Sequence, residues 1–169
     1  MSDPLHLFVS PVVPATPRGR DDYGSGWWRS PRTHSGHQYR HPGIDLAVEP
    51  GQVVRSPILG RLSHIGWAYA GDDRYHALVV TGRWWRVRLL YVAPAVEVGQ
   101  MLAPGDLVGH AEDLRERYPG GGGRDPITPH VHFEVIPVEA ARLTGRFPTG
   151  AGPSVRIAPE ALVTLGGGE

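Results

Sequence analysis

Apolar residues occur along this chain in short runs that proline and glycine interrupt, rather than in the longer pattern of an amphipathic helix. The sequence contains 17 prolines and 23 glycines, which helix interiors tolerate poorly and turns favour. The runs between them are rich in valine, isoleucine, leucine and aromatic residues, as strands are. Their spacing predicts a mainly β domain, built as a small antiparallel sandwich or a partly open barrel. The predicted strands are Gln52–Ser56, Gly60–Ile65, Ala77–Thr81, Trp85–Val92, Leu107–Gly109 and His130–Ile136.

The two ends of the chain lie outside this strand pattern. Residues 1–37 predict an irregular N-terminal arm, which Trp27, Trp28 and the following Tyr39 would pack onto the domain. Residues 138–169 predict a C-terminal extension packed on the domain, with short helical turns after Pro137 and at Pro159–Leu162 and a glycine-rich end that frays. The domain itself is therefore expected over residues 38–137.

One long loop separates the last two predicted strands. The stretch from Ala111 to Pro129 combines a charged segment, predicted as a short helical turn, with four consecutive glycines at Gly120–Gly123. The glycines are not a phosphate-binding loop, because neither the preceding strand nor the following Lys-Ser/Thr pair is present. We expect a mobile loop that ends where the last strand begins.

Composition excludes several classes of protein. The 17 basic residues match the 17 acidic ones, so no net charge favours nucleic acid or an anionic membrane. The chain has no cysteine, so a zinc site would use histidine and carboxylate ligands. The N-terminus has no signal-peptide pattern, and no segment approaches a membrane span. We expect a soluble product, synthesised in the cytoplasm without an export signal.

Two histidine-containing stretches are candidates for one metal site. The first, HPGIDLAVEPGQ, begins at His41 and carries Asp45; the second, TPHVHFEVI, carries His130 and His132. Residues two apart on a strand share a face, so His130 and His132 face the same way. Two histidines and one carboxylate hold zinc with a position left open for water, as in catalytic sites. The alternative for the first stretch is a surface histidine near a turn carboxylate.

Together the two stretches resemble the M23 (lysostaphin/LytM-type) zinc metallopeptidases. HPGIDLAVEPGQVVRSPILGRL resembles the H-x-G-x-D opening of that domain, VEVGQMLAPGDLVGH resembles its Gly-Gln and Pro-Gly turns, and TPHVHFEVI resembles its closing H-x-H-F-E. The resemblance covers residues 38–137 and implies a small antiparallel β domain with a groove walled by loops. It implies Zn²⁺ bound by His41, Asp45 and His132, with His130 as the catalytic imidazole. The implied substrates are bacterial peptidoglycan peptides.

The sequence departs from this family at one catalytic position. The family has a second catalytic histidine in a Tyr-x-His motif, and here Ala93 follows Tyr91 at that place. Loss of one such group costs on the order of a hundred- to a thousandfold in rate. Either another side chain compensates, or the site binds zinc and turns over slowly or not at all. The candidate replacements are His64, His76, His110, Arg86 and Arg88, whereas His6, His34 and His37 are expected to be solvated side chains of the arm.

The leading prediction is a zinc-dependent endopeptidase that cleaves peptide bonds in bacterial peptidoglycan. Because no export signal is expected, delivery would come from a phage lysin, a virion tail or a contractile injection particle, with the other particle proteins as partners. The alternative is a catalytically impaired M23-fold module with a zinc-binding or structural role, which Ala93 favours. A third reading is a carbohydrate-binding β domain that uses Trp27, Trp28 or Trp84.

Overall fold

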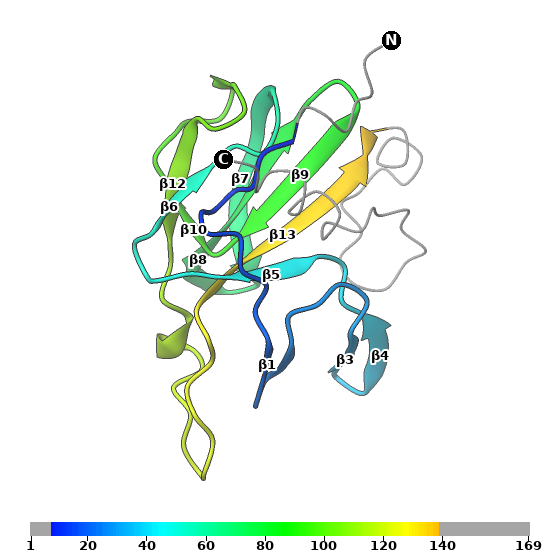
Figure 1. Ribbon diagram of the computed structural model, residues 1–169, viewed down its shortest axis with the longest axis vertical. Helices are drawn as coiled ribbons and strands as arrows, with labels where there is room; N and C mark the ends of the chain where they lie inside the picture. Colours follow the sequence, from blue (N-terminus) through cyan, green and yellow to red (C-terminus); the bar gives the residue numbers. More distant parts are fainter. Residues whose placement is uncertain (1–7, 139–169) are drawn as a thin grey trace.

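Antiparallel strands make up nearly all the regular structure, as the sequence predicts. The computed structural model describes residues 8–138 (Figure 1). The strands are β1 (Arg20–Asp21), β2 (Gly24–Ser25), β3 (Pro31–His34), β4 (His37–Arg40), β5 (Ile44–Ala47), β6 (Val53–Arg55), β7 (Gly60–Tyr69), β8 (Asp72–Thr81), β9 (Trp85–Leu90), β10 (Val92–Pro94), β11 (Met101–Leu102), β12 (Leu107–Ala111) and β13 (His130–Pro137), with one 3₁₀ turn, η2 (Leu114–Glu116).

Two sheets form the body of the domain. The larger has six strands in the order β11-β7-β8-β9-β13-β5, and the smaller has three in the order β10-β12-β6. The chain crosses between the two sheets several times, and one of these crossings lies between β9 and β10. The predicted mainly β, antiparallel architecture is confirmed.

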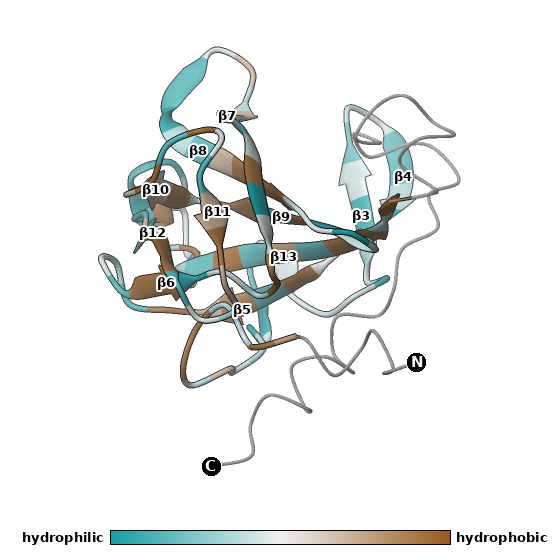
Figure 2. Cartoon of the chain, turned by 90° about the horizontal axis from the view of Figure 1, so that it is seen from above, coloured by the Kyte–Doolittle hydropathy of each residue, from teal (hydrophilic) through white to brown (hydrophobic). Residues whose placement is uncertain are grey.

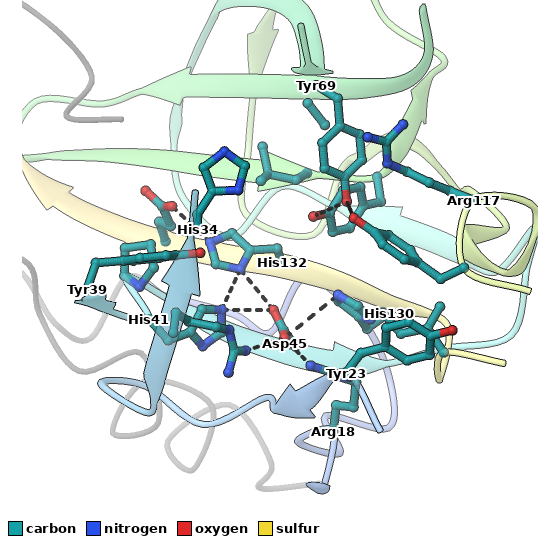
Figure 3. Close-up of a pocket in the computed structure, with 18 of the residues that line it drawn as sticks. Arg18, Tyr23, His34, Tyr39, His41, Asp45, Tyr69, Arg117, His130 and His132 are labelled. Atoms are coloured by element: carbon teal, nitrogen blue, oxygen red, sulfur yellow. Dashed lines mark hydrogen bonds and ion pairs between the residues drawn. The ribbon is translucent and has the colours of Figure 1, made fainter. Parts of the chain in front are cut away.

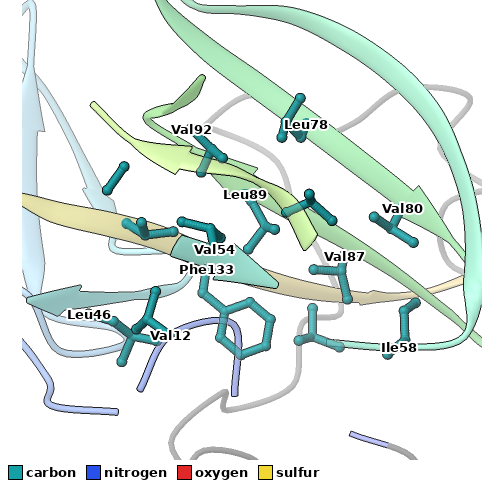
Figure 4. Close-up of a cluster of buried hydrophobic side chains, with 14 of the residues drawn as sticks. Val12, Leu46, Val54, Ile58, Leu78, Val80, Val87, Leu89, Val92 and Phe133 are labelled. Atoms are coloured by element: carbon teal, nitrogen blue, oxygen red, sulfur yellow. The ribbon is translucent and has the colours of Figure 1, made fainter. Parts of the chain in front are cut away.

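Side chains from both sheets and from the N-terminal segment form one core. Alternation along β9 buries Val87 and Leu89, while Arg86 and Arg88, which alternate with them, stay partly exposed. Phe133 of β13 and Val54 of β6 join the same cluster, together with Val12 from the N-terminal segment (Figure 4). Figure 2 shows hydrophobic segments on the central strands, whereas hairpin β3–β4 is mostly hydrophilic. Burial of these apolar side chains therefore holds the two sheets together, whereas hairpin β3–β4 contributes no residue to this core.

Several strand boundaries differ from the prediction. Strands β7 and β8 are each 10 residues long and extend well beyond the predicted runs. The predicted strand Trp85–Val92 is divided at Tyr91, whose φ of 68° interrupts the extended conformation. Strand β5 was not among the predicted strands, because its four residues follow a Pro-Gly pair directly. Length and interruption depend on pairing partners, which a single run of residues does not reveal.

The N-terminal segment is more ordered than the predicted irregular arm. It contains two hairpins, β1–β2 and β3–β4. Its backbone also pairs with β5, since the amide of Arg18 donates to the carbonyl of Asp45 at 2.7 Å and the amide of Ala47 donates to the carbonyl of Thr16 at 2.8 Å. The segment from residue 8 onward is thus part of the domain and not an appendage.

The long loop after β12 is anchored to this N-terminal segment. Its predicted helical turn is present as η2. The amide of Asp125 donates to the Asp22 carboxylate at 3.1 Å, and the amide of Thr128 donates to the Asp21 carboxylate at 3.2 Å. These two bonds hold the end of the expected mobile loop against the domain.

The C-terminal predictions lie outside the described residues. These are the packed extension over residues 138–169, its helical turns and its frayed end; His6 is outside as well. Within residues 8–138, the structure has no helix with the length and apolar character that crossing a membrane requires.

Candidate metal centre

Strands β5 and β13 bring three of the predicted ligand residues together. In the antiparallel register His132 lies opposite Asp45, so the two side chains project side by side from one face. The Nε2 atom of His41, which precedes β5, lies 3.1 Å from Oδ1 of Asp45 and 3.0 Å from Nδ1 of His132. The third separation, from His132 Nδ1 to Asp45 Oδ1, is 2.8 Å (Figure 3). All three side chains are buried.

Gly43 explains why the first stretch needs glycine between its histidine and its aspartate. A Cβ atom at this position would lie 2.3 Å from the carbonyl oxygen of Phe133 and 2.9 Å from Cγ of Glu134. Only a residue without a side chain lets the start of β5 approach β13 this closely. The spacing His-Pro-Gly-Ile-Asp therefore encodes a contact between the two ligand-bearing strands.

Hydrogen bonds set the tautomers of the two ligand histidines. Nδ1 of His41 lies 2.9 Å from the carbonyl oxygen of Trp27, so it carries the proton and donates. Nε2 of His132 lies 2.8 Å from Oε1 of Glu134 and donates in the same way. With protons on the outer nitrogens, the inner nitrogens, which lie 3.0 Å apart, are the atoms that can donate lone pairs to a metal ion.

This arrangement fits a metal cation. Zinc bonds of about 2.0–2.2 Å place neighbouring tetrahedral ligands about 3.3–3.6 Å apart. The three separations in the structure, 2.8–3.1 Å, are a few tenths of an ångström shorter. Burial raises the pKa of Asp45, but the neighbouring His130, His132 and His41 lower it more strongly, so the net pKa lies well below the usual value. The site thus offers a carboxylate and two imidazole lone pairs, which are zinc ligands.

His130 lies beside this centre on the same face of β13. Its Nδ1 donates to the carbonyl oxygen of Thr128 at 2.7 Å, and its Nε2 is 3.7 Å from Oδ2 of Asp45. Burial lowers the pKa of His130 to about 4, so the ring is neutral near pH 7. A neutral ring with its Nδ1 proton engaged presents Nε2 as a proton acceptor toward the metal centre.

Two arginines of the N-terminal segment surround Asp45 from the other side. Arg18 is buried and donates to Oδ2 of Asp45 at 3.0 Å, and Arg32 of β3 lies 3.5 Å from the same oxygen. Arg18 also pairs with Asp21 at 2.5 Å, the carboxylate that anchors the long loop. Sequence reasoning missed these residues because they lie outside the motif-bearing region. The ion pairs engage Oδ2 and leave Oδ1 for the metal.

The centre lies in a groove of about 900 Å³. Hairpin β3–β4 walls one side, and the opposite side carries Tyr69 and Arg117 (Figure 3). Tyr91 and Tyr118 also line the groove. Within the described part of the chain, the histidines that line this groove besides those at 41, 130 and 132 are His34 and His37, both exposed on hairpin β3–β4. They are solvated, as predicted, yet they face the groove.

Most of the candidate replacements for the missing histidine lie away from the groove. His110 is exposed and pairs with Ala93 in the smaller sheet, and neither residue lines the groove. His76 is bound to Glu112 at 2.6 Å and packs against Trp67. His64 and Arg86 do not line the groove either. Of the predicted candidates only Arg88 does, 3.7 Å from Glu134.

Comparison with solved structures identifies the class of this domain. A zinc-containing peptidase from Vibrio cholerae superposes with a TM-score of 0.54 and 27% identity, over 78% of this chain and 37% of that one. The catalytic domain of lysostaphin, an antimicrobial peptidase from Staphylococcus simulans, gives a TM-score of 0.54 and 20% identity, over 83% and 90% of the two chains. The fold and the site define an M23, lysostaphin-type domain, as the resemblance implies.

Comparison of sequences identifies the family. No family model matches the sequence. Leukocyte cell-derived chemotaxin-2 of Mus musculus is 30% identical over 115 residues, which are 68% of this chain and 69% of that protein. Myeloid protein 1 of Gallus gallus is 26% identical over 154 residues, and the chain spans only 45% of that protein. The chain belongs to the same family as the chemotaxin, on an M23-type domain.

Proposed function

We propose that this chain is a zinc-dependent endopeptidase that hydrolyses peptide bonds in bacterial peptidoglycan. In this proposal His41, Asp45 and His132 hold the zinc ion and His130 is the catalytic base. One observation carries the proposal: two imidazole lone pairs and one carboxylate oxygen converge within 4.8 Å of one another, beside a third imidazole. The likeness to zinc peptidases of known structure supports the same chemistry.

The residues of the chain would divide the reaction as follows. A bound zinc ion would polarise the substrate carbonyl and lower the pKa of the attacking water. Nε2 of His130 would accept the proton from that water and pass it to the leaving amine. The Thr128 carbonyl, which engages Nδ1 of His130, would keep the ring oriented during both transfers.

Release of new amino groups from purified peptidoglycan tests this function. The full chain is loaded with zinc, its metal content is measured, and its activity is compared with that of the His130→Ala variant at equal zinc content. We expect the wild type to release amino groups and the variant to lose at least about a hundredfold in rate. Equal release from both proteins would contradict the assignment of His130.

A second candidate function is a zinc-binding module without turnover. Ala93 favours it, because this alanine replaces the family's second catalytic histidine and does not line the groove. The similarity to a protein named as a chemotaxin also favours it. This candidate predicts stoichiometric zinc with no amino-group release from any peptidoglycan. Polysaccharide binding that survives chelation would instead favour the carbohydrate-binding reading. Delivery by a phage or an injection particle stays a prediction.

A further inference from the structure

Tyr91 has an unusual backbone conformation between β9 and β10, one of the places where the chain changes sheets. Its φ is 68°, a left-handed value that costs a residue with a side chain on the order of 1 kcal/mol. Two backbone hydrogen bonds hold it there: its amide donates to the carbonyl of His76 at 2.8 Å, and its carbonyl accepts from the amide of Glu112 at 3.0 Å. The strain is therefore imposed by both neighbouring strands.

This conformation turns the Tyr91 side chain into the groove. The ring meets the candidate base His130 edge to face, with centroids 5.3 Å apart and planes at 89°. Ala93, two residues later, pairs with His110 in the other sheet. The side chain that faces the metal centre from this part of the chain is thus the tyrosine, and not the residue at the family's histidine position.

A line of three tyrosine hydroxyls leaves the Tyr91 proton available. The hydroxyl of Tyr118 donates to Tyr69 at 3.3 Å, and the hydroxyl of Tyr69 donates to Tyr91 at 2.9 Å. Each hydroxyl has one proton, so Tyr91 accepts one bond and can still donate its own. Among residues 8–138 the structure records no acceptor for that proton. Burial raises the pKa of Tyr91, which keeps the hydroxyl protonated.

We propose that the Tyr91 hydroxyl donates a hydrogen bond to the ligand oxygen that the metal centre attracts, in place of the missing imidazole. The catalytic part of this inference rests on the proposed function. In catalysis, the ligand oxygen would be the substrate carbonyl oxygen, which gains negative charge as water attacks. The binding part does not require catalysis, because a metal ion and a phenol together would select any ligand that carries an oxyanion. Carboxylates, hydroxamates and the tetrahedral form of a peptide bond share this chemistry.

Other side chains in the groove are less suited to this role. Arg18 and Arg32 are engaged by Asp45. Arg88 lies against Glu134, on the far side of the ligand histidine. A neutral phenol whose oxygen is already held by a neighbouring hydroxyl is an oriented donor, as hydrogen-bond donors for developing oxyanions must be.

The test compares Tyr91→Phe with Tyr75→Phe. Tyr75 is a matched control, since it is a buried tyrosine that packs in one cluster with Tyr69, Tyr91 and Tyr118. Its hydroxyl donates to the Asp113 carbonyl, and it does not line the groove. All proteins are loaded with zinc, and equal zinc content establishes that the site is intact. The first measurement is the dissociation constant of acetohydroxamate by calorimetry. We expect about tenfold weaker binding in Tyr91→Phe and no change in Tyr75→Phe.

The second measurement is the rate of peptidoglycan hydrolysis. We expect Tyr91→Phe to lower kcat by about a hundredfold and to leave KM nearly unchanged. A wild type that binds hydroxamate through Tyr91 but hydrolyses nothing would reject the proposed function and retain this inference. Unchanged hydroxamate affinity in Tyr91→Phe would overturn the inference, whether or not the wild type hydrolyses peptidoglycan.

Discussion

Replacing Gly43 by alanine tests whether close contact between β5 and β13 builds the metal centre. The added Cβ would lie 2.3 Å from the carbonyl oxygen of Phe133, whereas ordinary contacts begin at 3.4 Å. The two strands must therefore separate by about 1 Å, and overpacking of this size costs about 1–3 kcal/mol of folding stability. Zinc sites tolerate distance changes of only about 0.2 Å, so zinc affinity should fall by about tenfold or more.

Gly19→Ala is the matched control for this substitution. A Cβ at Gly19 meets nothing within 4 Å, and the position is in the same N-terminal half of the chain. Urea unfolding of both variants gives the stability change, and competition with a chelating dye gives the zinc dissociation constant. We expect the control to stay within about 0.5 kcal/mol of the wild type. If Gly43→Ala matched the control in both measurements, the strand contact would not be what positions the ligands.

Two further substitutions probe groups that lie behind the ligands, and chelation probes the centre itself. Glu134→Gln removes the carboxylate that accepts the Nε2 proton of His132, and should weaken zinc binding about 10- to 100-fold, with exposed Glu97→Gln as the unaffected control. Burial raises the pKa of Asp21, but its bonds from Arg18 and from the Thr128 amide give a net pKa below the usual 3.8. The Asp21 carboxylate therefore stabilises the folded protein at pH values above its usual pKa. This contribution is lost as the pH falls through the lower pKa of the folded state. In urea unfolding near neutral pH, the free energy of unfolding of the wild type should exceed that of Asp21→Asn by about 1–2 kcal/mol. The difference should disappear in acid, and a difference that stays constant with pH would contradict this account. Zinc added after chelation should raise the Tm of the wild type and leave that of His132→Ala unchanged.

Sequence patterns predicted the features that depend on residues close together in the chain. Strand-forming runs between turn residues gave most of the central strands, and the His-x-His in an apolar run placed His130 and His132 on one face, as they are in β13. The convergence of His41 with them followed from a resemblance, because 91 residues separate the two ligand histidines. No short-range rule connects such distant positions.

What the sequence did not predict depends on packing between distant segments. Arg18 is 27 residues from Asp45, and no spacing rule links a buried arginine to its carboxylate. The hairpins of the N-terminal segment are two to four residues per strand, too short for an alternation pattern to stand out. Yet these short elements hold the second carboxylate oxygen of Asp45 and the end of the long loop, so they complete the groove.

The substitution Ala93→His decides between two accounts of the missing histidine. Residues two apart share a face only while a strand stays extended, and the left-handed Tyr91 breaks that alternation just before position 93. A histidine at 93 would therefore point toward His110 in the smaller sheet and not into the groove. We expect zinc content and the rate of amino-group release to match those of the wild type. A gain in rate of about a hundredfold would show that position 93 reaches the metal centre after all, and that Tyr91 does not occupy its place.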